Sequence, residues 1–524
     1  MSGLNENRSR INYANRFALI LFVALIVNMA FYWLPDTIFG VQLKKVDMLS
    51  DIREPLDEDD LDLIALFPDD DDDFYEDKPS FQMPADVNFY PVEISPDSNF
   101  LFLSRISSAI DGTLDGALEG DSIVGGDISA DAIAVDGANK AVDDDNTNYL
   151  FNTDIEDFTS GRTGLRRFFA ALNNIDNLER PVRIAFVGDS FIEGDIIVAD
   201  FREKMQAHFG GRGVGLVPIA SNVTQYRPTI KQSADGWSIY SIIKNRSKKH
   251  VISGLLFEPT SGSASVNFQT VDVHPRLKEV SSLKFIYSKN ESADILLKSN
   301  ADSSFYRLPP TGKVTQLEVK GDFNRGTLQF KNAKGLNAIG IALEDNHGVV
   351  VDNFSLRGNS GLVMSEVDGE TCRELQRIRP YDLIVLQYGL NVASDSVRNY
   401  SWYGNKMVAV IEHIQSCFPG ADILLLGVSD RSRKRGGAYS TMPAVVSLLR
   451  AQRQTAKNAE VTFWSIFAAM GGQNSMVNYV NSNWASKDYT HLNMRGGREI
   501  ANALYDAIIM EKEMYDGDER LVER

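Results

Sequence analysis

The sequence predicts an α/β protein whose parallel sheet is interrupted by an inserted all-β region. Two observations lead to this prediction. Short apolar runs alternate with helical patterns over residues 161–221 and again over 348–524, which is typical of a parallel sheet covered by helices on both faces. Residues 222–347 instead show short alternating runs separated by Gly, Asn, Asp or Pro and no helical pattern, which is typical of an antiparallel sandwich.

Each apolar run of the α/β part is expected to form one strand of a three-layer arrangement. The expected strands lie at 182–187, 349–354, 382–387, 421–427 and 461–464. The expected helices lie at 165–175, 195–209, 364–379, 404–418, 442–457 and 496–512.

The segment before these parts predicts a membrane anchor. Residues 17–34 are apolar except for Asn28, and a helix of this length is about long enough to cross a bilayer. A cleaved signal peptide is the alternative, but the apolar run is long and no A-x-A-like cleavage site follows it. We expect a single-pass protein with residues 1–16 in the cytoplasm and its body outside, which is the periplasm in a Gram-negative bacterium.

Residues 35–160 are predicted to form an acidic, low-complexity linker. They contain blocks of Asp and Glu and a stretch rich in Asp, Gly and Ala, so they have few bulky apolar side chains that could form a core. The whole chain has a formal net charge of −18, which argues against binding to nucleic acid. Its two cysteines, Cys372 and Cys417, exclude a disulfide scaffold, and the sequence leaves their pairing open.

Three short motifs at the ends of predicted strands carry candidate chemistry. Gly188-Asp189-Ser190 follows the first strand, where the carboxyl edge of a parallel sheet commonly holds a site. Asp488 and His491 lie three residues apart on one loop, so a single segment can supply a base and the acceptor that orients it. Asn391 follows the strand at 382–387, where its amide can donate to an oxyanion.

The order of these motifs resembles the sequence blocks of the SGNH (GDSL-like) hydrolases. VRIAFVGDSFIEGD stands at the first block, YGLN at the third and DYTHLN at the last. The second block is best placed at Arg357–Gly361, with Gly215 in GGRGVG as the rival candidate. The resemblance covers about 180–220 and 350–510, and it is closest to bacterial carbohydrate and peptidoglycan O-acetylesterases that carry an inserted β-sandwich similar to a carbohydrate-binding module.

The resemblance implies a serine esterase that removes acetyl groups from an extracytoplasmic polysaccharide. Ser190 would be the nucleophile, His491 its base and Asp488 the orienting acid. The backbone N–H groups of Ser190 and Gly361 and the side chain of Asn391 would form the oxyanion hole. We expect neither a cofactor nor a metal ion, and no protein partner can be named.

Two other functions remain open at this stage. A membrane-anchored polysaccharide O-acetyltransferase would use the same residues but pass the acyl group to a sugar hydroxyl. A non-catalytic glycan-binding envelope protein would need none of them. A basic loop that contains Arg431, Arg433, Lys434 and Arg435 is also expected at the carboxyl edge, where it could meet an anionic glycan, although a solvated loop is the commoner interpretation.

Overall fold

The protein is described by a computed structural model that covers residues 37–38, 41–42, 147–220, 227–299 and 302–522. The chain divides into two compact units, Met1–Pro84 and Ala85–Arg524. In the first unit, β1 (Thr37–Ile38) and β2 (Val41–Gln42) form an antiparallel pair. The predicted anchor at 17–34 and most of the predicted linker lie outside the described residues. Within the described part of the chain, no helix combines the length and apolar character needed to cross a bilayer.

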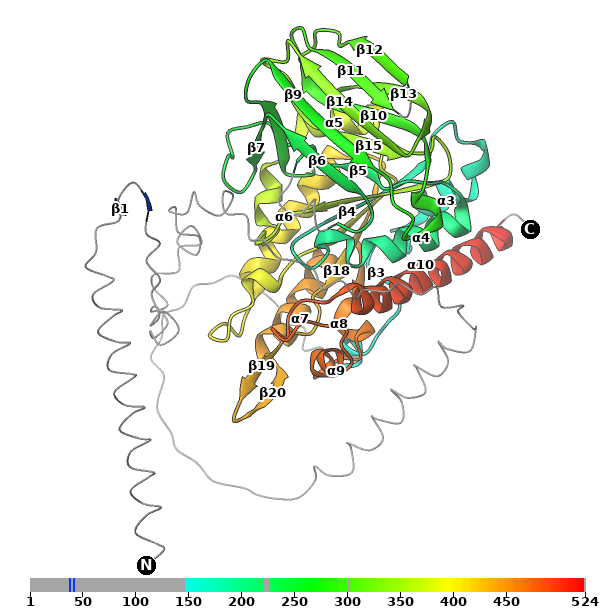
Figure 1. Ribbon diagram of the computed structural model, residues 1–524. Helices are drawn as coiled ribbons and strands as arrows, with labels where there is room; N and C mark the ends of the chain where they lie inside the picture. Colours follow the sequence, from blue (N-terminus) through cyan, green and yellow to red (C-terminus); the bar gives the residue numbers. More distant parts are fainter. Residues whose placement is uncertain (1–36, 39–40, 43–146, 221–226, 300–301, 523–524) are drawn as a thin grey trace, which may run out of the picture. The chain divides into compact units, whose positions relative to one another are not determined.

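The second unit contains the predicted parallel sheet, drawn at the centre of Figure 1. Its strands, in spatial order, are β16 (Val349–Ser355), β4 (Val182–Gly188), β17 (Leu383–Gln387), β18 (Asp422–Gly427), β21 (Thr462–Ser465) and β3 (Glu156–Asp157). The first five are mutually parallel, and β3 is antiparallel to β21. Every residue of β4 and β17 is buried, as expected for central strands that are covered on both faces.

Two groups of helices cover the sheet and complete three layers, with one group on each side in Figure 1. One group contains α3 (Arg166–Asn173), α4 (Val198–Phe209) and α10 (Met494–Val522). The other contains α5 (Gly369–Ile378), α6 (Ser401–Cys417) and α7 (Pro443–Asn458). Two short helices, α8 (Ile466–Ala469) and α9 (Ser475–Asn481), follow β21. Cys372 on α5 and Cys417 on α6 are both buried and carry free thiols.

The described residues of 215–344, here called the two-sheet region, form two antiparallel sheets that share one apolar core. One sheet contains β5 (Gly215–Val217), β7 (Trp237–Ser241), β8 (Leu255–Pro259), β10 (Val280–Lys289), β13 (Thr315–Phe323) and β15 (Asn337–Glu344). The other contains β6 (Lys231–Asp235), β9 (Ser263–Gln269), β11 (Asp294–Ser299), β12 (Asp302–Arg307) and β14 (Arg325–Lys331). Alternate residues of β9 are buried, which is the period-two pattern of a strand with one face on a core.

Two expected boundaries differ from the structure. The linker was expected to reach residue 160, but β3 pairs with β21, and Ile155 beside it is only 4% exposed. The β insertion was expected to begin at 222, but β5 already pairs with β15 of the two-sheet region. Strands of two or three residues are too short to show a periodicity, so the sequence pattern did not indicate them.

Buried ion pairs join the two-sheet region to the parallel sheet. Glu344 on β15 accepts from Arg183 on β4 at 2.9 Å and lies 2.7 Å from the guanidinium of Arg379. Arg379 also pairs with Asp352 on β16 at 2.8 Å. We call Arg183, Lys284, Glu344, Asp352 and Arg379 the junction cluster. Because breaking a buried pair leaves an uncompensated charge, this cluster holds the two regions together.

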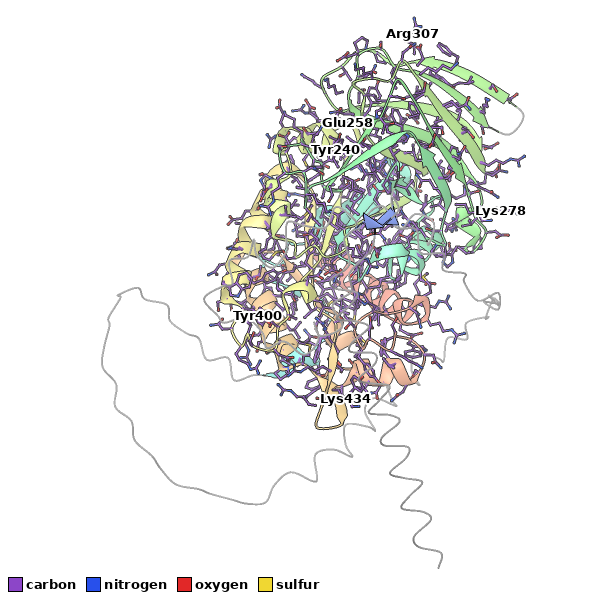
Figure 2. All side chains as sticks on the ribbon, turned by 60° about the vertical axis from the view of Figure 1, so that its left-hand side comes forward. Tyr240, Glu258, Lys278, Arg307, Tyr400 and Lys434 are labelled. Atoms are coloured by element: carbon purple, nitrogen blue, oxygen red, sulfur yellow. The ribbon has the colours of Figure 1, made fainter. Side chains whose placement is uncertain are left out.

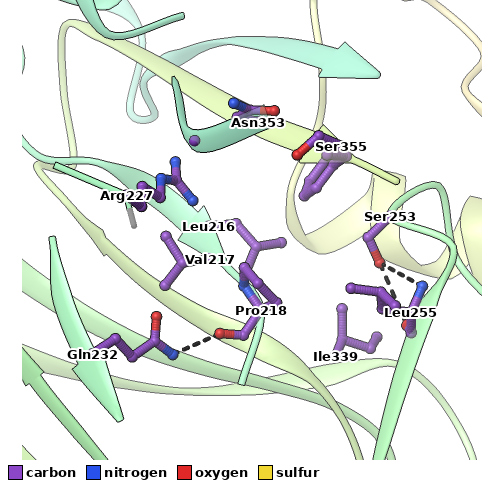
Figure 3. A pocket seen from close by; sticks show the side chains of 12 residues that line it. Leu216, Val217, Pro218, Arg227, Gln232, Ser253, Leu255, Ile339, Asn353 and Ser355 are labelled. Atoms are coloured by element: carbon purple, nitrogen blue, oxygen red, sulfur yellow. Dashed lines mark hydrogen bonds between the residues drawn. The ribbon is translucent and has the colours of Figure 1, made fainter. Parts of the chain in front are cut away.

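A small cavity lies at the same junction (Figure 3). Its lining includes Asn353 and Ser355 from β16, and Leu216, Gln232 and Ile339 from the two-sheet region. Its volume of about 40 Å³ suits one or a few water molecules and is far too small for a sugar ring. It is therefore a packing gap between the regions and not a substrate pocket.

Candidate active site

Ser190 lies just beyond the carboxyl end of the central strand β4. At Gly188, the last residue of that strand, an added Cβ would lie 2.7 Å from the carbonyl oxygen of Gln387 on neighbouring β17. Only glycine fits this close approach of two strands. Glu193 N–H donates to the carbonyl of Ser190 at 3.3 Å and closes the turn that presents the serine at the sheet edge.

His491 and Asp488 come from the loop before α10, here called the His491 loop (residues 488–491). The Oγ of Ser190 lies 3.1 Å from Nε2 of His491, across 301 positions of sequence. Nδ1 of His491 lies 2.7 Å from Oδ2 of Asp488. A proton on Nδ1 that is donated to this carboxylate leaves the Nε2 lone pair directed at the serine hydroxyl. The structure thus brings together the three side chains that were expected to form the reactive set.

The Asp488 carboxylate is stabilised in its charged form. Partial burial raises its pKa, but hydrogen bonds from His491 and Thr490 outweigh this effect, so the pKa lies below its usual value. Both the Thr490 and the His491 backbone N–H groups donate to Oδ1, at 3.0 and 3.1 Å. The acceptor that orients His491 therefore stays ionised at neutral pH.

The two other expected oxyanion donors, the Asn391 amide and the Gly361 N–H, lie close together, and both already donate hydrogen bonds to other groups of the protein. Nδ2 of Asn391 donates to Oδ2 of Asp189 at 2.9 Å and to the carbonyl of Asn359 at 3.0 Å. The N–H of Gly361 donates to Oδ1 of Asn359 at 2.8 Å. Gly361 has a φ of 91°, and a Cβ there would lie 2.8 Å from the Tyr388 ring, so the position needs glycine. To reach an oxyanion, either donor must exchange its present partner.

Asp189 and Asn359 are the residues of this arrangement that sequence reasoning missed. Asp189 is only 1% exposed, and its carboxylate accepts from Phe191 N–H as well as from Asn391. Burial raises the pKa of Asp189 to about 7, although hydrogen bonds to the carboxylate partly oppose this. Its place beside Ser190 in the first motif was the available signal, but only the fold brings it to Asn391.

Gly215, the rival second-block glycine, lies elsewhere. It has a φ of 76° within β5, and a Cβ there would lie 2.2 Å from Oδ1 of Asp352. Its glycine character lets β5 approach the junction cluster, and the adjacent Leu216 N–H donates to Asp352 at 2.7 Å. The structure therefore gives Gly215 a packing role. Among the described residues, no group of three or more His, Cys, Asp or Glu side chains is placed to hold a metal ion.

Comparison with solved structures finds a likeness that covers more than two thirds of this chain. The match to a structure described as a peptidoglycan O-acetylesterase in action has 22% identity and a TM-score of 0.57, and it covers 69% of this chain and 99% of that chain. A family two carbohydrate esterase from Cellvibrio japonicus also matches, with 10% identity, a TM-score of 0.24, and coverage of 54% of this chain and 98% of that chain. No protein-family model matches the sequence, and no curated protein matches it.

The parallel sheet and the first of these likenesses define the class of fold. The chain shares its fold with the first of these solved structures, and the order of its motifs resembles that of the SGNH hydrolases. One solved protein that it resembles over more than two thirds of its length is described as a peptidoglycan O-acetylesterase. At 22% identity this likeness concerns the fold, and the chemistry must be argued from the residues of this chain.

Proposed function

We propose that this protein is a serine esterase that removes O-acetyl groups, or similar short acyl groups, from a polysaccharide such as peptidoglycan. One observation carries the proposal, the contact of 3.1 Å between Ser190 Oγ and His491 Nε2 at the carboxyl edge of the sheet. A serine hydroxyl becomes a good nucleophile only when a positioned base takes its proton, and His491 stands in that place.

The proposed reaction has two halves. Ser190 Oγ attacks the ester carbonyl while its proton passes to Nε2 of His491, and Asp488 stabilises the resulting imidazolium. His491 then returns the proton to the departing sugar oxygen, which leaves an acetyl group on Ser190. A water molecule, deprotonated by His491, attacks this acyl-enzyme and releases acetate with the serine restored.

The tetrahedral oxyanion formed in each half needs donors. We assign this role to the backbone N–H groups of Ser190 and Gly361 and to the amide of Asn391. Asp189 and Asn359, which hold the Asn391 amide, act as positioning residues for it.

Acetate release from a panel of O-acetylated glycans, including acetylated peptidoglycan, tests the proposal. We expect release by the wild-type chain, and none above background by Ser190→Ala. Adding a sugar acceptor and measuring acetylated product beside free acetate separates hydrolysis from acyl transfer. Equal acetate release by both proteins would end the proposal.

We also propose that the chain acts outside the cytoplasm, held by residues 17–34, and that the two-sheet region contributes to glycan binding. An open groove of about 1070 Å³ on the two-sheet region supports the second part. Its lining combines polar side chains, such as Asp294, Arg307 and Asn332, with apolar ones at residues 308–310. Protease digestion of intact cells tests the location, since an extracytoplasmic domain must be cleaved once the outer barrier is opened.

A further inference from the structure

The basic loop that follows β18 forms a hairpin at the edge where Ser190 lies. Its strands are β19 (Ser432–Arg435) and β20 (Ala438–Thr441), joined by Gly436 and Gly437. In Figure 1 the two strands project from the α/β part of the unit, and Figure 2 labels Lys434 at the projecting end. We call residues 431–441 the basic hairpin.

One side of the basic hairpin docks on the His491 loop. Ser432 N–H donates to the carbonyl of Tyr489 at 3.1 Å. The ring of Tyr439 stacks on that of Tyr489, with centroids 3.6 Å apart and planes 8° apart. Tyr489 lies between Asp488 and His491 and has a φ of 55°, which a non-glycine residue adopts only when its surroundings hold it there. The hairpin is therefore part of what shapes the loop that carries the base.

The other contacts of the basic hairpin reach the turn that carries Asn391. Arg433 forms an ion pair with Asp395, four residues after Asn391. The guanidinium of Arg431 donates to the carbonyl of Leu390 at 3.4 Å, a long hydrogen bond. The hairpin thus contacts both loops that supply candidate catalytic side chains, and it forms part of the rim around Ser190.

Two cations of the basic hairpin have no charged partner. Lys434 and Arg435 are exposed, and neither forms an ion pair within the described part of the chain. The hairpin has no acidic residue of its own in a protein whose net charge is −18. Unpaired cations beside a site attract anions and favour their binding there, since nothing local neutralises them.

We propose that Lys434 and Arg435 bind carboxylate groups of the polysaccharide and make the site selective for acetylated glycans that carry negative charge. The proposal rests on the esterase function proposed above and names its substrate class. A sugar polymer that lies across Ser190 would bring carboxylates of neighbouring residues to the projecting hairpin, while the acetylated residue reaches the serine.

The test compares two polymers that differ in charge, O-acetylated polygalacturonate and its methyl-esterified form. The hairpin variant is Lys434→Ser/Arg435→Ser. A matched control, Arg377→Ser/Lys406→Ser, removes two exposed cations from α5 and α6. We expect the ratio of kcat/KM for charged over methyl-esterified polymer to fall about 3- to 10-fold in the hairpin variant and to hold in the control. Raising NaCl to about 0.5 M should lower the wild-type ratio towards that of the hairpin variant.

A wild-type ratio near one, or equal falls in both variants, would overturn the proposal. Binding of polygalacturonate to Ser190→Ala, with and without the hairpin substitutions, tests the hairpin when no ester is cleaved. Weaker binding to the protein that also carries the hairpin substitutions supports the proposal, and equal binding to both proteins overturns it. Failure of the esterase function appears separately, as acetate release that does not depend on Ser190.

Discussion

The residues at the carboxyl edge of the parallel sheet and the junction cluster use similar charged side chains in opposite surroundings. At the edge, the side chains of His491 and Asp488 are 37% and 47% exposed. At the junction, those of Arg379 and Glu344 are 1% and 0% exposed. At the junction, burial raises the pKa of Glu344, but the positive charges of Arg379, Arg183 and Lys284 outweigh this effect and hold the pKa well below its usual value.

This difference in burial separates reactivity from stability. A buried charge cannot lose its partner without a large desolvation cost, so the junction cluster keeps one arrangement and fixes the two regions to each other. An exposed acid–base pair costs little to rearrange and remains accessible to a substrate and to water. We therefore expect substitutions at the edge to reduce turnover and substitutions at the junction to reduce stability.

The largest expected effect is that of Ser190→Ala. Removing the nucleophile should lower kcat by about 10⁴-fold or more, because no acyl-enzyme can form. The free energy of unfolding, measured with urea, should stay within about 1 kcal/mol of wild type, since the hydroxyl is not part of the buried core. Labelling by a serine-directed phosphonate should be lost as well. A large loss of unfolding free energy in Ser190→Ala would contradict the expectation that substitutions at the sheet edge reduce turnover and not stability.

Glu344→Gln tests the expectation that substitutions in the junction cluster reduce stability. The substitution leaves Arg379, Arg183 and Lys284 without their shared carboxylate, which should cost about 3–5 kcal/mol of unfolding free energy. Because the folded-state pKa of Glu344 is lowered, its contribution is present above the unfolded pKa and is lost as the pH falls through the folded value. The difference between wild type and variant should therefore shrink in acid. Per folded molecule, kcat should change little, and a large loss of kcat would place the junction in the catalytic machinery.

The sequence predicts the main strands and the reactive residues, but it does not predict the contacts that position these residues. Each of the five parallel strands coincides with an apolar run, and Ser190, Asp488 and His491 lie in motifs whose order is distinctive. The partners that position them could not be predicted, because the contacts of Asp189 with Asn391 and of Tyr439 with Tyr489 join distant segments. Short elements such as β3 and β5 carry no periodic signal, and tertiary pairing alone defines them.

Asn391→Ala is expected to have the next largest effect on turnover. Losing one oxyanion donor typically lowers kcat by about 10²–10³-fold, while KM changes little. The amide is held by Asp189 and Asn359 in the free protein, so its role depends on exchanging one of these partners for the oxyanion. Steady-state kinetics on an acetylated glycan measures the effect. A kcat close to that of wild type would show that Asn391 only bridges Asp189 and Asn359.

Asp189 shares a feature with each of the two regions. It is buried, like the residues of the junction cluster, yet it lies beside Ser190 at the carboxyl edge of the sheet. Its folded-state pKa of about 7 exceeds the unfolded value, so between about pH 4 and pH 7 the folded chain retains a proton that the unfolded chain has released. Its contribution to stability is therefore present at low pH and is lost as the pH rises through about 7. Asp189→Asn cannot titrate, so the stability of wild type relative to this variant should fall by a few kcal/mol from about pH 4 to about pH 8, at roughly 1.4 kcal/mol per pKa unit.

Urea unfolding of the two proteins across this range measures that difference, and Asp235→Asn on the exposed face of β6 is a matched control. An equal fall relative to Asp235→Asn would show that the change does not arise at Asp189. A wild-type stability that rises relative to Asp189→Asn over the same range would mean that the folded protein stabilises the ionised carboxylate. Asp189 would then resemble Glu344 in its electrostatics, and the ionised carboxylate would be the form that accepts from Asn391 at neutral pH.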